Sequence, residues 1–230
     1  MIVKKNLSKM NTNHHLAFEY LESKFNKDEK NYRVLDVGAG AHPWAFDWIT
    51  HIIDAFVEPK DFKKFDDSHI KVYNFDAQDS IEWQDILDDV EESGKFDFVI
   101  CSHTLEDVNN PKVLCKMINR VGNAGFVSMP SKYAELTPFE NKYNLPYCGY
   151  HHHRWIYQIK DDTLIGYPKM NFYDYVSFDF DQSKAVHSEI AFLWEGEFKY
   201  ELLAPDQMLD NRKGENRIED LFIDDDLILT

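Results

Sequence analysis

The segment YRVLDVGAGAHPW, residues 32–44, constrains the fold more than any other part of this chain. Its first half, RVLDV, has the aliphatic and β-branched side chains typical of a short buried strand. Gly38 and Gly40 then end the strand, and glycine can adopt positive φ and let another molecule approach the backbone closely. A strand that runs into a glycine turn in an α/β sheet is a usual binding place for a nucleotide-like ligand. The segment therefore predicts an open α/β sheet with a ligand site at this turn.

The acid in this segment, Asp36, discriminates between classes of ligand. A dinucleotide fingerprint reads G-x-G-x-x-G and leaves a helix N-terminus free for a pyrophosphate. Here Pro43 occupies the position of the third glycine, and an anion beside Asp36 would be repelled. A ligand with an amine and a cationic centre fits the carboxylate better, which disfavours a nicotinamide-dependent oxidoreductase.

The motif Asp-Val-Gly-Ala-Gly, at the end of a strand, resembles the first motif of class I S-adenosylmethionine-dependent methyltransferases. The resemblance implies that Asp36, Gly38, Ala39 and Gly40 flank the methionine part of S-adenosylmethionine, with S-adenosylhomocysteine as the product. His42 is a departure, because many members of the family have a third glycine there. An ordinary glycine turn in an unrelated α/β protein is the alternative for the motif alone.

Two further acids follow at the ends of the next predicted strands, residues 51–57 and 70–76. Asp54 comes 18 residues after Asp36, a spacing that suits a βαβ unit whose second acid accepts hydrogen bonds from ribose hydroxyls. Glu58 takes this role if the strand is longer, and a solvated loop acid is the alternative. The resemblance adds Asp76 and Ala77, a carboxylate and a backbone amide near adenine.

Residues 96–102 predict a fourth strand, and the sequence His-Thr-Leu-Glu-Asp-Val follows it. Small class I methyltransferases often read D-x-V-x-x-x-H-V-L-E-H-V here, so the resemblance continues, with Asp107 in place of the second histidine. It implies that Ser102 and His103 border the cofactor and its transferable methyl group. A buried histidine satisfied by backbone groups is the alternative for His103.

The predicted fold is a single Rossmann-like, doubly wound domain. Its mostly parallel seven-stranded sheet has helices on both faces, and a C-terminal β-hairpin region is added. A fifth strand ends in Gly-Phe-Val-Ser-Met-Pro-Ser, which is similar to the family's G-Y-I-E-x-P-S. Helices are expected at residues 14–25, 44–50, 81–92 and 111–120. The expected regions are an N-terminal helix (1–30), a cofactor-binding core (31–136), an acceptor-side and sheet-completing β region (137–205) and an acidic tail (206–230).

The β region carries a run of three histidines before a predicted hairpin, with strands at 156–160 and 163–167. The elements G-x-H-H-R-W and F-x-W-E-G-x-F-x-Y-E resemble bacterial methyltransferases of cell-surface sugar pathways. We expect His152 and His153, with His103, to be candidate general bases at the acceptor, because imidazole titrates near neutral pH. On a strand, His151 and His153 would share one face, as in an H-x-H metal site, but no further ligand set is legible and we assign no metal.

The acidic composition narrows the possible partners. The formal net charge is −16, and no Lys/Arg cluster is legible in the sequence, so DNA and RNA are disfavoured and a small molecule or sugar is expected. No apolar run is long enough to span a membrane, and the N-terminus lacks the apolar region of a secretory signal. Three widely spaced cysteines without C-x-x-C spacing favour a cytoplasmic location, and the aromatic segments are compatible with a homodimer.

The sequence thus predicts methyl transfer from S-adenosylmethionine to a small-molecule or saccharide acceptor, with O-methylation of a sugar or glycan precursor preferred. A methyltransferase-like binding or scaffold protein without activity is the main alternative, because of His42 and Asp107. A nicotinamide-dependent oxidoreductase is the less favoured one.

Overall fold

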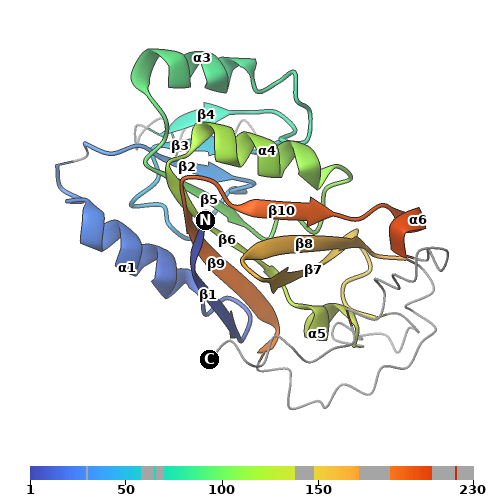
Figure 1. Ribbon diagram of the computed structural model, residues 1–230. Coiled ribbons are helices and arrows are strands. Elements are labelled where there is room, and N and C mark those ends of the chain that lie inside the picture. The colour runs from blue at the N-terminus through green and yellow to red at the C-terminus, as the bar shows by residue number, and fades with distance from the viewer. Residues whose placement is uncertain are drawn as a thin grey trace.

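The computed structural model (Figure 1) describes residues 1–29, 31–57, 65, 70–137, 148–170, 187–208 and 221. In these ranges the strands form a seven-stranded sheet, in the order β1-β9-β6-β5-β2-β3-β4, and a three-stranded sheet, in the order β10-β8-β7. The strands of the larger sheet are β1 (Ile2–Ser8), β2 (Val34–Val37), β3 (His51–Ile53), β4 (Lys71–Tyr73), β5 (Phe98–Ser102), β6 (Ala124–Pro130) and β9 (Glu189–Glu195). Those of the smaller sheet are β7 (Trp155–Lys160), β8 (Thr163–Pro168) and β10 (Lys199–Leu202).

The large sheet is parallel from β4 to β6, and β9 is antiparallel to both of its neighbours. Its strands carry apolar side chains on both faces, as expected for a sheet covered on both sides. In β2, Leu35 and Val37 belong to one buried cluster and Val34 to the other. The predicted Rossmann-like, mostly parallel seven-stranded fold is confirmed.

Helices cover both faces of this sheet (Figure 1). The helix α1 (His14–Lys24) buries Leu16 and Leu21 on one face, in the cluster that contains Val34. On the other face, α3 (Gln84–Ser93) contributes Ile86 and α4 (Pro111–Val121) contributes seven buried residues. Two short helices, α5 (Lys132–Glu135) and α6 (Pro205–Met208), follow β6 and β10. None of the helices in the described ranges has both the length and the apolar character needed to cross a bilayer.

Three expectations about the elements were wrong. Residues 44–50 form turns instead of a helix, with one hydrogen bond from Ile49 N–H to Ala45 O. This single turn already buries three apolar side chains of the segment, those of Ala45, Trp48 and Ile49. Within the predicted sheet-completing region, 137–205, β9 does join the large sheet, but the hairpin β7–β8 does not, because it pairs with β10 in a separate sheet. Residues 2–8, expected only as part of a helical N-terminal region, form β1, which pairs with β9.

The acidic tail lies mostly outside the described residues, as do residues 58–64 and 138–147. The other predicted helices and strands are confirmed with shifts of a few residues at their ends. The strands β3 and β4 are shorter than the predicted strands at residues 51–57 and 70–76. Asp54 therefore follows β3 directly, and Asp76 lies three residues after β4.

Candidate functional site

The residues predicted to bind the cofactor lie at or near the carboxyl ends of the parallel strands β2, β3, β4 and β5. The turn Gly38–Gly40 follows β2, Asp54 follows β3, and His103 follows β5. Since β2 lies between β3 and β5, these ends are neighbours along one edge of the sheet. This is the edge at which open α/β sheets bind ligands.

The glycine turn is packed closely on one side and open on the other. Gly38 has φ +78° and donates its N–H to Ile53 O at 2.8 Å. A Cβ added at Gly38 would lie 2.3 Å from Thr104 Oγ1, whereas one added at Gly40 (φ +60°) would meet nothing within 4 Å. The turn therefore requires glycine at both positions for its backbone conformation, and at Gly38 also for space.

The Asp36 carboxyl is buried, with 3% of the residue exposed, and it makes no hydrogen bond within the described part of the chain. Burial, followed by the charge of Asp54, raises its pKa to about 8. A cation placed beside this carboxyl would lower the pKa again, because it would stabilise the ionised form. The predicted preference for a cationic ligand is consistent with this setting.

Asp54 holds the glycine turn in place. Its Oδ2 accepts the Gly40 N–H at 2.7 Å, and its Oδ1 accepts the Phe56 N–H at 2.7 Å. Each carboxylate oxygen has a second lone pair, so the ribose role predicted for Asp54 remains available to it. The alternative acid, Glu58, lies outside the described residues. Phe56 is 89% exposed, so a large apolar ring faces solvent next to the predicted ribose position.

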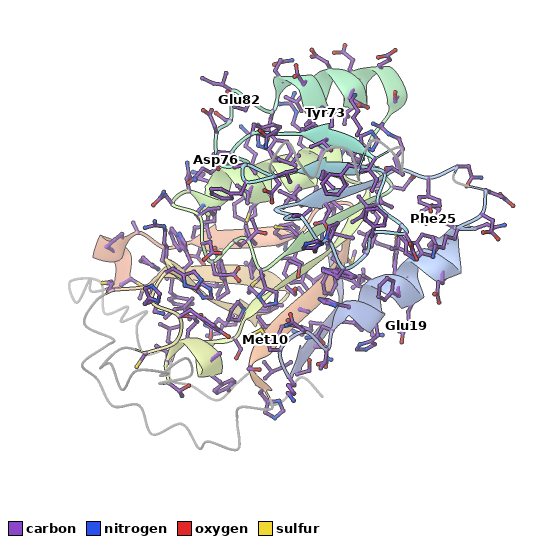
Figure 2. The ribbon with its side chains drawn as sticks, turned by 180° about the vertical axis from the view of Figure 1, so that it is seen from behind. Met10, Glu19, Phe25, Tyr73, Asp76 and Glu82 are labelled. Atoms are coloured by element: carbon purple, nitrogen blue, oxygen red, sulfur yellow. The ribbon has the colours of Figure 1, made fainter. Side chains whose placement is uncertain are left out.

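Asp76 and Ala77 begin the turn after β4. Asp76 is exposed, as Figure 2 shows, and its carboxylate accepts hydrogen bonds from the backbone and side-chain nitrogens of Gln78. Ala77 O accepts the indole N–H of the buried Trp83 at 2.8 Å. These bonds fix the shape of the turn, and the adenine role stays a prediction.

Ser102 and His103, at the end of β5, form hydrogen bonds to the neighbouring strand β6. Ser102 Oγ lies 2.8 Å from Ser128 Oγ, and His103 N–H donates to Ser128 O at 2.8 Å. His103 has φ +52°, a conformation that few non-glycine residues adopt and that occurs often at functional sites. The next residue, Thr104, is the one that contacts Gly38, so His103 and the glycine turn are packed together.

The His103 ring lies between two buried carboxylates. Its Nε2 is 2.7 Å from Glu189 Oε2, and its Nδ1 is 3.3 Å from Glu106 Oε1. Burial lowers the pKa of His103, but the two carboxylates outweigh it and raise the pKa to about 10. The imidazole is therefore protonated at neutral pH. His103 is not satisfied by backbone groups, contrary to the alternative considered from the sequence.

Glu189 also binds the N-terminal segment. It accepts the Asn11 N–H at 2.9 Å and Asn13 Nδ2 at 2.8 Å. Burial alone would raise the pKa of Glu189, but the hydrogen bonds from His103 and the Asn11 backbone lower it overall. Glu189 is thus an anion that links β9, the loop after β5 and the start of α1.

All three histidines predicted as catalytic lie on one pocket of about 290 Å³. Its lining comes from distant segments of the chain: Met10, Asn11, His103, Glu106, Asp107, Pro130, Tyr150, His152 and His153. Met10 marks the position of the N-terminal segment in Figure 2. The structure brings these predicted residues together, and their catalytic roles stay a prediction.

His153 is held by a second buried acid. Its Nδ1 is 2.6 Å from Glu135 Oε1, and Lys169 Nζ is 2.7 Å from Glu135 Oε2. The other ring nitrogen, Nε2, points toward Asp107, with Oδ1 at 3.6 Å. His152 is more exposed, and its Nε2 is 3.8 Å from the same Asp107 oxygen.

Several polar residues of the pocket were missed from the sequence. Glu106 belongs to the motif quoted above, so its position was a usable signal. Glu135, Glu189 and Asn11 gave none, because single polar residues at strand and helix ends show no pattern until the fold brings them together.

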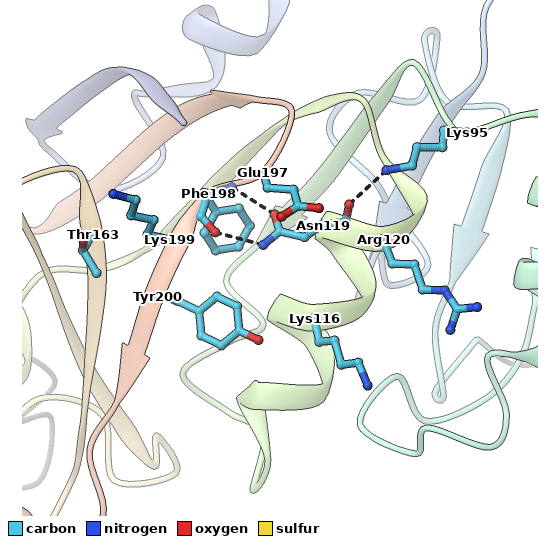
Figure 3. A pocket seen from close by; sticks show the side chains of 9 residues that line it. All are labelled: Lys95, Lys116, Asn119, Arg120, Thr163, Glu197, Phe198, Lys199 and Tyr200. Carbon is cyan, nitrogen blue, oxygen red and sulfur yellow. Dashed lines mark hydrogen bonds between the residues drawn. The ribbon is translucent and has the colours of Figure 1, made fainter.

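A larger cavity, of about 810 Å³, lies away from these residues (Figure 3). It is lined by Lys95, Lys116, Asn119, Arg120, Thr163, Glu197, Phe198, Lys199 and Tyr200. The sequence shows no Lys/Arg cluster, but the fold brings four basic side chains from separate segments together at this cavity: Lys95, Lys116, Arg120 and Lys199. No residue predicted for the site lines this cavity, whereas all three predicted catalytic histidines line the smaller pocket.

Comparison with known proteins identifies the family. Residues 9–161, about two-thirds of the chain, match the family profile of the methyltransferase domain. A search of curated proteins returns no match to the sequence.

Solved structures with a similar arrangement are distant in sequence. Thermoplasma acidophilum 1320 is 13% identical, with 79% of this chain and 86% of that chain covered and a TM-score of 0.40. The N-terminal domain of EvdMO1, solved in the presence of SAH and D-fucose, is 14% identical, with coverages of 82% and 69% and a TM-score of 0.38. An S-adenosylmethionine-dependent methyltransferase from Mesorhizobium loti is 11% identical, with coverages of 66% and 63% and a TM-score of 0.35. The chain spans only 28% of full-length EvdMO1 and 40% of an O-methyltransferase family protein from Burkholderia thailandensis.

Proposed function

The chain belongs to the methyltransferase domain family, whose class I members use S-adenosylmethionine, and we propose that it methylates a hydroxyl group of a sugar or another small polar molecule. The observation that carries the proposal is that Thr104, which packs on the glycine turn, is the chain neighbour of the pocket residue His103. A cofactor at the turn and an acceptor in the pocket would therefore be neighbours.

The cofactor side of the proposal uses the residues at the ends of β2, β3 and β4. Asp36, Gly38, Ala39 and Gly40 would hold the methionine part, Asp54 the ribose, and Asp76 with Ala77 the adenine. The unpartnered, buried Asp36 carboxyl supports this assignment, because S-adenosylmethionine carries an ammonium group and a sulfonium. Ser102 and His103 would lie beside the methyl group.

The acceptor side uses the pocket of about 290 Å³, which is at the small end of the range for ligand pockets and suits a single sugar ring. Its polar lining fits hydroxyl groups, and the Tyr150 ring supplies an apolar surface. The net charge of −16 argues against a nucleic-acid acceptor.

The reaction would be an in-line displacement, so positioning of the two reactants is the main contribution of the protein. The acceptor oxygen forms a bond to the methyl carbon while the carbon–sulfur bond breaks, which leaves neutral S-adenosylhomocysteine. The hydroxyl proton has to leave. His103 is protonated at neutral pH and is therefore unsuited to accept it, so we assign His103 to orienting the acceptor. The proton would leave toward His152 or His153, which line the same pocket.

The location and assembly remain part of the proposal. Cys101 and Cys115 are buried free thiols, which is compatible with the expected reducing cytoplasm. A homodimer stays an expectation from the sequence.

Calorimetric titration with S-adenosylmethionine, S-adenosylhomocysteine and NADH tests the cofactor. We expect both adenosyl ligands to bind, Asp54→Ala to weaken them, and the exposed control Asp47→Ala to leave them unchanged. Transfer of a labelled methyl group to a panel of sugars and sugar nucleotides then tests the acceptor. Folded protein that binds neither adenosyl ligand would refute the cofactor assignment. Binding without transfer to any acceptor would favour the scaffold alternative.

A further inference from the structure

We propose that Asp107, His152 and His153 form a binding site for a divalent transition-metal ion such as Zn²⁺, at the exposed end of the pocket. Each residue offers one ligand atom, and the three atoms lie within 4.8 Å of one another. The Nε2 atoms of His152 and His153 are 3.8 and 3.6 Å from Asp107 Oδ1. This site goes beyond the proposed methyl transfer and does not depend on it. With a metal ion bound, His152 and His153 would act as ligands, so the role of proton acceptor given to them above applies to the metal-free protein.

The distances are close to those of a metal centre. Zinc binds imidazole nitrogen and carboxylate oxygen at about 2.0–2.2 Å, so tetrahedral ligand atoms are separated by about 3.4 Å. Each histidine nitrogen would have to approach Asp107 Oδ1 by only a few tenths of an ångström. The two histidine nitrogens lie within 4.8 Å of each other and would have to approach by up to about 1.4 Å. The His152 side chain is 52% exposed and the Asp107 side chain 45%, so both have room to move.

An independent observation is the support of His153 by a buried carboxylate. Glu135, which is 0% exposed, lies 2.6 Å from His153 Nδ1. A carboxylate on one ring nitrogen keeps the proton there and leaves the other nitrogen free to bind a metal, an arrangement that recurs around metal-ligating histidines. The free nitrogen here is the one that points to Asp107. Gly149 packs directly on Glu135, since a Cβ there would lie 2.5 Å from Glu135 Oε2.

The two segments that carry the ligands are also fastened to each other. Arg154, the residue after His153, donates its backbone N–H to Glu106 O at 2.7 Å. Its Nε donates to Asp107 O at 3.1 Å. Arg154 thus fastens the end of the histidine run to the loop after β5, next to the ligand residue Asp107, so the ligands from the two segments are held close together.

The ligand types select the class of ion. Two imidazoles and one carboxylate suit Zn²⁺, Fe²⁺, Co²⁺ or Ni²⁺, whereas Mg²⁺ and Ca²⁺ prefer oxygen ligands alone. Three protein ligands leave a coordination position for water or another oxygen, as in catalytic zinc sites. Since all three ligands line the pocket, an acceptor hydroxyl could occupy this position, and its pKa would fall on binding. The pair His151 and His153, considered from the sequence, is not the pair that converges.

The test is metal binding by the full chain, prepared without a histidine tag and stripped with a chelator. Zn²⁺ is titrated by calorimetry, and Co²⁺ is followed by its visible absorption, which reports the coordination geometry. We expect one ion per chain, and binding at least tenfold weaker in His152→Ala and in Asp107→Asn. His151→Ala is the matched control, because it removes the adjacent histidine and should bind as the wild type does.

Glu135→Gln adds a readout of the supporting carboxylate, with an expected loss of about 10–100-fold in affinity. Circular dichroism checks that this buried variant folds, and the exposed His152→Ala keeps the test decisive if it does not. The proposal is overturned if the folded wild type binds neither ion, if His151→Ala loses as much affinity as His152→Ala, or if Asp107→Asn binds like the wild type.

Discussion

Replacing Glu189 by glutamine should destabilise the protein in a pH-dependent way. Glu189 Oε2 accepts hydrogen bonds from His103 Nε2 at 2.7 Å and from the Asn11 N–H at 2.9 Å, while Oε1 accepts one from Asn13 Nδ2 at 2.8 Å. Glutamine has one acceptor oxygen, so in Glu189→Gln an amide NH₂ faces a donor on one side or the other. The variant also removes one of the two charges that keep His103 protonated.

The magnitude follows from the pKa of His103, which rises from 6.5 to about 10. A shift of one pKa unit corresponds to about 1.4 kcal/mol, so the whole shift is worth at most about 5 kcal/mol. Glu106 and Glu189 both contribute, and we assign about 2–3 kcal/mol to Glu189. His14, also close, has a pKa lowered mainly by burial.

The sign of the pH dependence follows from the raised pKa. The stabilisation is fully present below about pH 6.5, and it is lost as the pH rises through about 10, because the folded protein then releases the proton it held more tightly. Glu189→Gln should therefore be less stable than the wild type by about 2–3 kcal/mol near pH 6.5. The difference should shrink toward pH 10.

Urea unfolding at about pH 6.5, 8 and 9.5 measures this difference, and an NMR titration of the His103 ring measures the pKa directly. Glu195→Gln is the matched control, since Glu195 is an exposed acid at the other end of β9. A stability difference that is the same at all three pH values would refute the reasoning, as would a His103 ring that titrates near pH 6.5 in the wild type.

Three further predictions concern the sheet and its glycine turn. In urea unfolding, Gly38→Ala should lower the free energy of unfolding by about 2–4 kcal/mol and Gly40→Ala by only about 1 kcal/mol. Both glycines have positive φ, but only Gly38 is packed against a side chain. Equal losses in the two variants would contradict this reasoning. Binding of S-adenosylmethionine near pH 7 should release a proton from Asp36, whose pKa is about 8 in the free protein. Calorimetry in buffers of different ionisation enthalpy should detect this proton in the wild type. Asp36→Asn should show no such release. Asp89 accepts hydrogen bonds from Arg33, Lys71 and Tyr73, and these partners outweigh burial and lower its pKa to about 2. Asp89→Asn should thus cost about 2 kcal/mol at neutral pH and less as the pH falls toward 2, and a loss that does not change with pH would exclude the ionic contribution.

The parallel half of the fold could be predicted because its signals are local. A buried strand before a glycine turn, an acid after the next strand and the periodicity of α4 each lie within a few residues of sequence. The resemblance to S-adenosylmethionine-dependent methyltransferases rests on the same segments and is confirmed by the family profile. The convergence of the predicted cofactor residues follows from the parallel order of the strands, which the topology shows directly.

The antiparallel edge was predicted only in part, since the sheet-completing region at 137–205 contains β9 but the pairing of β9 with residues 2–8 was not expected. The strand β1 reads as a polar segment, IVKKNLS, with only Ile2 and Leu7 buried, and it becomes a strand because β9 lies beside it. Nothing near Glu189 in the sequence indicates that it meets His103 across 86 residues. Both the strand β1 and the contact between Glu189 and His103 depend on tertiary pairing, which can outweigh the local preference of a segment for strand or loop.

The pocket owes part of its chemistry to this antiparallel edge. His103 and Glu106 lie on the loop after the parallel strand β5, as the family pattern implies. The second carboxylate beside the His103 ring, Glu189, belongs to β9. The same anion binds Asn11 and Asn13, so the N-terminal segment closes one wall of the pocket only when β9 is in place. At the opposite wall, the small sheet presents the histidine run against Asp107. The family profile covers residues 9–161 and so includes every lining residue of the pocket. Glu189 lies outside that range, so its ion pair with His103 is a feature of this pocket that the profile does not describe.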